Sequence, residues 1–189
     1  MKRIFSFVLV IGLVMALPVL AQWEPDVRLT YNESISYTSS NNAWCVAATG
    51  DTVHVVWEDS RDGNREIYTK RSPDGGLSWG ADTRLTYNRG YSDKPSVAAS
   101  GSNVHVVWFD LRDGNYEIYA KRSTDGGLSW GTDMRLTYNS GYSYYSSVAA
   151  SGSNVNVVWH DDRDGKYDVS YFSCFRLPAT DARYWRNLG

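Results

Sequence analysis

Three loops of the chain carry the same set of charged side chains in the pattern Asp-x-Arg-Asp-Gly. They contain Asp59, Arg61, Asp62, Asp110, Arg112, Asp113, Asp161, Arg163 and Asp164. Carboxylates accept hydrogen bonds from hydroxyl groups, and a guanidinium holds a carboxylate through two parallel hydrogen bonds. Tyrosines lie near these loops, at Tyr91, Tyr116, Tyr142 and Tyr167. Because aromatic faces cover the apolar faces of sugar rings, these residues predict a face that binds carbohydrate. The alternative, in which each aspartate only pairs with the arginine of its own turn, stays open.

A repeat of 51 residues positions these loops. Trp57, Trp108 and Trp159 are spaced by that period, and 27 of 35 positions are identical between residues 57–91 and 108–142. In the middle copy, β-branched and aromatic residues predict four strands, at 96–100, 104–109, 116–122 and 133–137. Short turn-forming segments separate them, so we expect each unit to be a four-stranded antiparallel meander.

The strand at 104–109 is apolar on both faces. Val104, Val106 and Trp108 lie on one side, and His105 and Val107 on the other. Such a sheet needs a neighbouring sheet on each side, which radially arranged blades supply. The repeat length is also that of propeller blades. We therefore expect an all-β fold, a β-propeller of about three four-stranded blades, with a β-solenoid as the alternative.

The turn after the third strand resembles a known motif. Ser72-Pro-Asp74-Gly-Gly76-Leu-Ser78-Trp79 and its second copy are similar to the Asp box, Ser/Thr-x-Asp-x-Gly-x-Thr/Ser-Trp, of bacterial neuraminidase (BNR) repeats in sialidase-like β-propellers. The second copy is Ser123, Asp125, Gly127, Ser129 and Trp130. We expect a structural role for both, since an aspartate and a serine can bind the backbone of their own turn and glycine permits positive φ. In an antiparallel meander these turns lie at the opposite end from the Asp-x-Arg-Asp-Gly loops.

The resemblance implies an exo-sialidase-type glycoside hydrolase, or a truncated remnant of one, as one function. The chain departs from that family: it lacks the Phe/Tyr-Arg-Ile-Pro motif, and no residue matches the family's tyrosine–glutamate pair or acid/base aspartate. Nearly identical repeats also offer similar environments, whereas glycoside hydrolysis needs carboxyl groups with different pKa values. The preferred prediction is therefore a non-catalytic module that binds glycan or an extracellular protein, with no catalytic residue assigned.

Residues 1–21 have the basic start, apolar core and small-residue exit of a signal peptide, so we expect a secreted, periplasmic or cell-surface protein. Blades are expected over 22–172 and a divergent tail over 173–189. No later segment is apolar enough to span a membrane. The net charge of −2, without a basic cluster, argues against a nucleic-acid partner. Pairing between Cys45 and Cys174 stays open.

The two ends of the repeat region are complementary. Residues 26–30 match the fourth strand of a blade, and the last copy supplies three strands without a fourth. The chain is therefore expected to be a partial ring or half of a six-bladed homodimer. No metal or cofactor is expected. Calcium at the Asp-x-Arg-Asp-Gly loops is the alternative, although their spacing does not fit an EF-hand.

Overall fold

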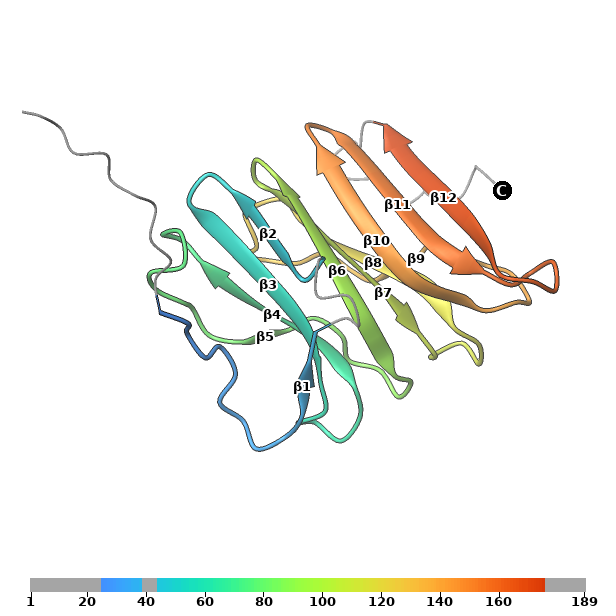
Figure 1. Cartoon of the computed structure of the whole chain (residues 1–189), viewed down its shortest axis with the longest axis horizontal. Helices are drawn as coiled ribbons and strands as arrows, with labels where there is room; N and C mark the ends of the chain where they lie inside the picture. Colours follow the sequence, from blue (N-terminus) through green and yellow to red (C-terminus); the bar gives the residue numbers. More distant parts are fainter. Residues whose placement is uncertain (1–24, 39–43, 176–189) are drawn as a thin grey trace, which may run out of the picture.

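The computed structural model describes residues 25–38 and 44–175, with side chains as far as Ser173, and this part of the chain is all-β (Figure 1). None of these residues forms a helix, so none offers a helix that could cross a membrane. The expected signal peptide at 1–21 and the tail from 176 lie outside the described residues. The prediction of an all-β fold is confirmed.

The strands form three antiparallel sheets. The N-terminal sheet contains β1 (Ser36–Tyr37), β2 (Val46–Thr49), β3 (Thr52–Asp59), β4 (Glu66–Ser72) and β5 (Thr83–Arg84). The middle sheet contains β6 (Ser92–Ser100), β7 (Asn103–Asp110), β8 (Glu117–Ser123) and β9 (Met134–Arg135). The C-terminal sheet contains β10 (Ser143–Ser151), β11 (Asn154–Asp161) and β12 (Asp168–Phe175). The middle and C-terminal sheets are meanders of consecutive strands, as the turn signals predict, and β2 to β5 of the N-terminal sheet follow the same order.

The first strand of each sheet is irregular near its start. In β6 the pairing with β7 shifts between Asp93 and Ser96, and in β10 the pairing with β11 shifts at the equivalent place. Lys94 and Tyr145 lie in these bulges, both with a φ of 51°. In the N-terminal sheet, two short strands, β1 and β2, pair with successive parts of β3 in place of one continuous strand.

Two apolar layers join the three sheets. Val56, Ile67 and Leu85 of the N-terminal sheet pack with Val104, Val106 and Trp108 of the middle sheet. On the opposite face of the middle sheet, Val107, Phe109 and Ile118 pack with Val148, Val157 and Trp159 of the C-terminal sheet. The expected alternation along β7 is confirmed. Trp108 is fully buried, so replacing it with alanine would cost about 3–5 kcal/mol.

The turns divide between two ends of the sheets. At one end, Gly75 N donates to Asp51 O at 2.6 Å, which joins the β4–β5 turn to the β2–β3 turn. At the other end, Leu111 N donates to Tyr91 O at 3.0 Å, which joins the β7–β8 loop to the segment between β5 and β6. We call this second end the loop face: it comprises the Asp-x-Arg-Asp-Gly loops and the segments that lead into β6 and β10.

Two expectations about strands need correction. Residues 26–30 are not a strand, because a strand requires a ladder of hydrogen bonds and no strand among the described residues pairs with them. The third copy continues as strand to Phe175, beyond the boundary expected at 172, because β12 pairs with β11 as far as Asn154. Cys174 accordingly lies opposite Val155, the position that Ser123 occupies opposite Val104.

Candidate ligand-binding face

A buried aspartate anchors each loop of the loop face. Asp110, at the end of β7, is fully buried and its Oδ2 accepts hydrogen bonds from Trp108 Nε1 (2.9 Å), Ser92 Oγ (2.8 Å) and Arg112 Nη2 (2.6 Å). Burial alone would raise its pKa, but the hydrogen bonds from Arg112 and Trp108 outweigh burial and lower it. The carboxylate therefore stays charged and holds a strand, a loop and a tryptophan together.

The same arrangement recurs in the other two sheets. Asp59 accepts from Trp57 Nε1 at 2.9 Å and Arg61 Nη2 at 2.7 Å. Asp161 accepts from Trp159 Nε1 at 3.1 Å and from its own loop arginine at 2.6 Å. Both aspartates are buried and both have a lowered pKa.

The arginines of the first two loops are committed to these structural ties. Arg61 also binds Asp82 at 2.7 Å, and Arg112 binds Asp133 at the same distance. Their guanidinium groups lie over Tyr68 and Tyr119, 4.3 and 4.2 Å from the ring centroids. The third arginine is freer: the Arg163 side chain is 45% exposed, against 21% for Arg112.

The aspartate that follows the arginine in each loop has partners inside the protein in the first two sheets. Asp62 accepts a hydrogen bond from Tyr68 Oη and forms an ion pair with Arg84 at 2.9 Å. Asp113 makes the same two contacts, with Tyr119 Oη and with Arg135 at 3.0 Å. Asp164 in the third loop is exposed. The geometry thus matches the interpretation in which these aspartates and arginines stabilise the turns.

Aromatic rings gather between the middle and C-terminal sheets. The tyrosine cluster consists of Phe109, Tyr116, Tyr142, Tyr144 and Tyr145. Phe109 is buried and meets Tyr116, Tyr144 and Tyr145 edge to face, at centroid distances of 5.2–5.8 Å. Tyr142 stacks on Tyr144 at 5.6 Å. Tyr142 and Tyr145 are exposed, so the cluster has a buried base and an open surface.

Charged residues occupy the corresponding place between the N-terminal and middle sheets. We call Glu58, Arg65, Asp93 and Lys94 the charged junction. Lys94 binds Glu58 through its backbone N at 2.9 Å and its Nζ at 3.3 Å, and Arg65 binds Asp93 at 3.2 Å. Burial and the neighbouring Glu58 raise the pKa of Asp93 more than Arg65 lowers it. Tyr91 lies beside this junction, 5.5 Å from the Arg65 guanidinium.

The tyrosine cluster and the charged junction use equivalent positions of the repeat. One step of 51 residues relates the pairs Glu58 and Phe109, Arg65 and Tyr116, Asp93 and Tyr144, and Lys94 and Tyr145. Reasoning from the sequence selected Tyr91, Tyr116, Tyr142 and Tyr167 but missed the residues at the starts of β6 and β10. The signal was the change from Asp-Lys to Tyr-Tyr at 93–94 and 144–145.

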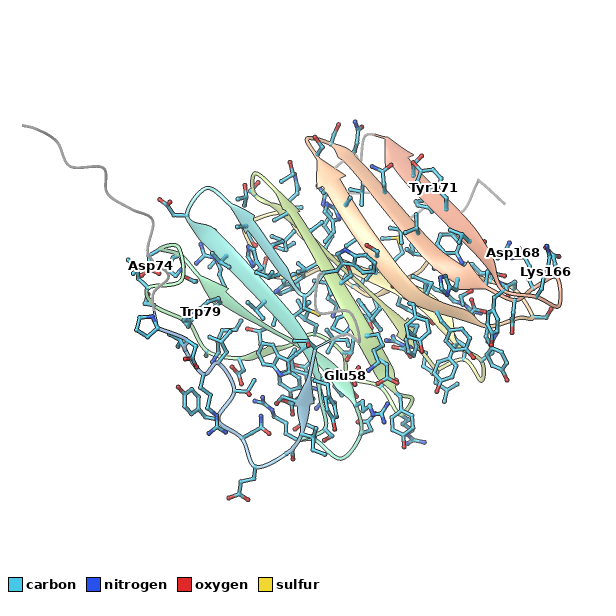
Figure 2. The ribbon with its side chains drawn as sticks, in the orientation of Figure 1. Glu58, Asp74, Trp79, Lys166, Asp168 and Tyr171 are labelled. Carbon is cyan, nitrogen blue, oxygen red and sulfur yellow. The ribbon has the colours of Figure 1, made fainter. Side chains whose placement is uncertain are left out.

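The Asp-box turns lie at the end of the sheets away from the loop face. Figure 2 shows Asp74 and Trp79 at the opposite end of the N-terminal sheet from Glu58. Ser72 Oγ accepts from Gly76 N at 2.8 Å, and Asp74 accepts from the Ser78 hydroxyl at 2.6 Å and its amide at 2.8 Å. The hydrogen bonds from Ser78 lower the pKa of Asp74. The turn therefore uses its own acid and hydroxyl groups internally.

The second Asp box repeats these bonds between Ser123, Asp125, Gly127 and Ser129. It also contacts the N-terminal sheet, because Arg71 Nε donates to Gly126 O at 2.8 Å. Trp130 packs against the apolar layer between the two sheets. The second turn therefore helps to hold the middle sheet against the N-terminal sheet.

Potential metal ligands do not cluster in the part of the chain that the structure describes. No group of three or more histidine, cysteine, aspartate or glutamate side chains among those residues could hold an ion. His54 and His105 are buried, and burial lowers both pKa values, that of His105 to about 4. Cys45 lies in the apolar layer between the first two sheets, 3.4 Å from Pro95 O, and the side chain of Cys174 lies outside the described residues.

Comparison with known proteins adds no assignment. No protein-family model matches the chain, and no curated protein matches it either. The site must therefore be interpreted from its own geometry.

Proposed function

We propose that the chain is a secreted, sialidase-like β-propeller module that binds glycan through the loop face and performs no chemistry on it. The three stacked meanders are taken as adjacent blades, and the tyrosine cluster is the main contact surface. The Asp-box resemblance and the apolar layers on both faces of the middle sheet support the arrangement.

The observation that carries the proposal is where the repeats differ. The ties made by Asp59 and Asp110 are the same in both sheets. Beside them, charged residues of one junction are replaced by aromatic residues in the next. A rigid scaffold that carries variable side chains on one face is typical of a binding surface.

The tyrosine cluster suits a sugar ring. Tyr142 and Tyr145 are exposed side chains that each carry an aromatic ring and a phenol hydroxyl, and both rings contact the half-buried Tyr144. Aromatic faces give apolar contact at low conformational-entropy cost, while hydroxyls bind polar ring substituents. Loop-face acids such as Asp110 do not suit catalysis, because Arg112 and Trp108 hold this carboxylate charged and inaccessible.

A glycan array followed by calorimetry on the best ligand tests the proposal. Tyr142→Ala and Tyr145→Ala should each weaken binding about 10-fold or more, equivalent to ~1.4 kcal/mol. Leu128→Ala is the matched control, since this exposed apolar residue lies in the second Asp-box turn. Absence of any glycan binding would reject the proposal and leave an extracellular protein as the partner.

Glycoside hydrolysis is the second candidate, and the charged junction supports it. Asp93 has a raised pKa and lies with Glu58 beside Arg65, so two carboxyl groups share a site in unlike surroundings. Turnover of a fluorogenic sialoside that is lost in Asp93→Asn would favour this function. A rate of sialoside hydrolysis no higher than that of the buffer blank, together with glycan binding, would favour the non-catalytic module.

A further inference from the structure

The two complete sheets show how a fourth strand is held. In the N-terminal sheet, Leu85 N donates to Ile67 O at 2.7 Å and Ile67 N donates to Thr86 Oγ1 at 2.8 Å. Arg84, which pairs with Tyr68, forms an ion pair with Glu66 at 3.0 Å. The docked segment thus contributes an arginine, a leucine amide and a threonine hydroxyl in succession.

The middle sheet repeats this set of contacts. Leu136 N donates to Ile118 O at 2.7 Å, Ile118 N donates to Thr137 Oγ1 at 2.8 Å, and Arg135 binds Glu117 at 2.7 Å. The strand that receives the segment therefore presents an acidic residue followed by an isoleucine. Both isoleucines are fully buried.

The outer edge of the C-terminal sheet presents chemically similar residues at the receiving positions. Asp168 takes the place of Glu117, and Val169 takes the place of Ile118. Val169 is 74% exposed, whereas Ile118 is fully buried. Among the described residues, β12 pairs only with β11. Figure 2 shows Asp168 and Tyr171 on this outermost strand.

The matching docked segment lies at the other end of the molecule. Arg28-Leu-Thr-Tyr-Asn32 has the same sequence as the segments that begin at Arg84 and Arg135. It also makes the same local hydrogen bond: Arg28 Nε donates to Thr30 O at 2.6 Å, and Arg84 Nε donates to Thr86 O at 2.7 Å. This segment, blue in Figure 1, lies at the opposite side of the stack of sheets from β12.

The N-terminal sheet binds this segment through the same hydrogen bonds that the middle sheet makes with the equivalent segment. Lys70 Nζ donates to Leu29 O at 2.6 Å, as Lys121 Nζ does to Leu85 O. Asn32 Nδ2 donates to Asp59 at 3.1 Å, as Asn88 does to Asp110 at 3.2 Å. The contacts with the following sheet are therefore present, while the described residues contain no preceding sheet for it.

We infer that residues 27–30 of one copy of the chain add to β12 of a second copy. The register of the complete sheets places Arg28 opposite Ser170, and Val27 opposite Tyr171, of the second copy. Arg28 then binds Asp168 of the second copy, and Thr30 accepts a hydrogen bond from the Val169 amide. The inference goes beyond the proposed function, because it concerns assembly and not the ligand.

The exposed face of the C-terminal sheet supports the same partner. Val158, Val169 and Tyr171 are exposed on this sheet, while the equivalent Val107, Ile118 and Ala120 are covered by the neighbouring sheet. A second N-terminal sheet stacked here covers them in the same way. Two copies bring six sheets together, within the roughly four to eight that close a propeller, so the assembly is a closed dimer.

Light scattering during size-exclusion chromatography of the exported protein tests this inference. The wild-type chain should have twice the mass of one chain. Arg28→Glu and Asp168→Arg should each reduce the mass to that of a single chain, and the two changes combined should restore the dimer. Both side chains are exposed, so each variant should keep its near-ultraviolet circular dichroism. Arg89→Glu, at an exposed loop position, is the control and should remain dimeric.

Crosslinking tests the register itself. A Val27→Cys copy mixed with a Tyr171→Cys copy should form a disulfide-linked pair, since directly opposite strand residues have the spacing that a disulfide needs. A Leu128→Cys copy mixed with the Tyr171→Cys copy should not. A monomeric wild-type chain, including one that dimerises only after removal of residues 176–189, would overturn the inference. So would a dimer that Arg28→Glu leaves intact.

Discussion

Gly127 lies against His54: a Cβ added at Gly127 would be 2.7 Å from His54 Cε1. The second Asp-box turn of the middle sheet therefore touches a strand of the N-terminal sheet directly. A Cβ added at the neighbouring Gly126 would meet no atom within 4 Å. Both glycines have a positive φ, which is 70° at Gly126 and 83° at Gly127. The pair separates the effect of a contact between sheets from the effect of backbone conformation.

Gly126→Ala should lower the free energy of unfolding by about 1 kcal/mol, the cost of a side chain at positive φ. Gly127→Ala should lower it by about 2–4 kcal/mol, because the added methyl group also displaces His54. Urea unfolding followed by tryptophan fluorescence measures both. Equal losses would show that His54 accommodates the added methyl group and that this contact between the sheets is not tightly packed.

Removal of the buried aspartate should have unequal effects in different sheets. Asp110→Ala leaves Arg112 and the buried Trp108 Nε1 without their shared acceptor, and should cost about 3–5 kcal/mol. Asp161→Ala should cost less, about 1–2 kcal/mol, because Arg163 is 45% exposed and water can replace the carboxylate. The measurement is again unfolding in urea, and a larger loss for Asp161→Ala would contradict this account.

His105 should make stability depend on pH. Burial, with a smaller effect of Arg122, lowers its pKa to about 4 in the folded chain, from an ordinary value of 6.5. Between these values the unfolded chain binds more protons, so the free energy of unfolding falls as the pH falls from 6.5 towards 4, by up to about 3 kcal/mol. Unfolding in urea over this pH range measures the slope.

His105→Asn should flatten this slope. The repeat itself supplies the substitution, because Asn156 occupies the equivalent position in β11. The flattening is partial, since His54 also has a lowered pKa. His160→Asn, at an exposed position, is the matched substitution elsewhere in the chain. An unaltered slope in His105→Asn would show that another group causes the dependence.

Tyr145 has a strained backbone conformation, and its ring belongs to the proposed glycan-binding surface. Its φ of 51° is unfavourable for a residue with a Cβ, so Tyr145→Gly should be about 1 kcal/mol more stable than Tyr145→Ala. Both variants lack the exposed ring and should bind glycan equally weakly. Comparison of the two by unfolding and by calorimetry checks the strain and the binding separately, and a less stable glycine variant would argue against strain at this position.

The period of the sequence predicted the three sheets well because each repeat forms its own meander. Trp108 and Val107 alternate between the two apolar layers as their positions in the strand require. The prediction that residues 26–30 form a strand was wrong, because strand formation depends on a partner strand, which local sequence does not reveal. The short strand β9 shows the same limit: only Met134–Arg135 of the expected 133–137 pair as strand.

The candidate site was less predictable. Asp59 and Arg61 were selected for their chemistry, but the structure uses them to tie Trp57 and the loop together. Asp93 and Tyr144 were missed because the bulges of β6 and β10, where each first strand meets its neighbouring sheet, cannot be read from the period alone. Charge and aromatic type selected the residues for this prediction, but they do not show which of those side chains stay accessible in the folded chain.

The ties made by Asp59 and Asp110 do not involve the residues that distinguish the two junctions. The charged junction could therefore be converted into a second tyrosine cluster as a unit, by replacing Glu58, Arg65, Asp93 and Lys94 with Phe, Tyr, Tyr and Tyr. The transplanted rings would enter a backbone that already contains the same bulge as its aromatic counterpart. On the proposed function, one chain would then carry two copies of the glycan-binding surface, and its avidity for a repeating glycan would rise without any change to the framework.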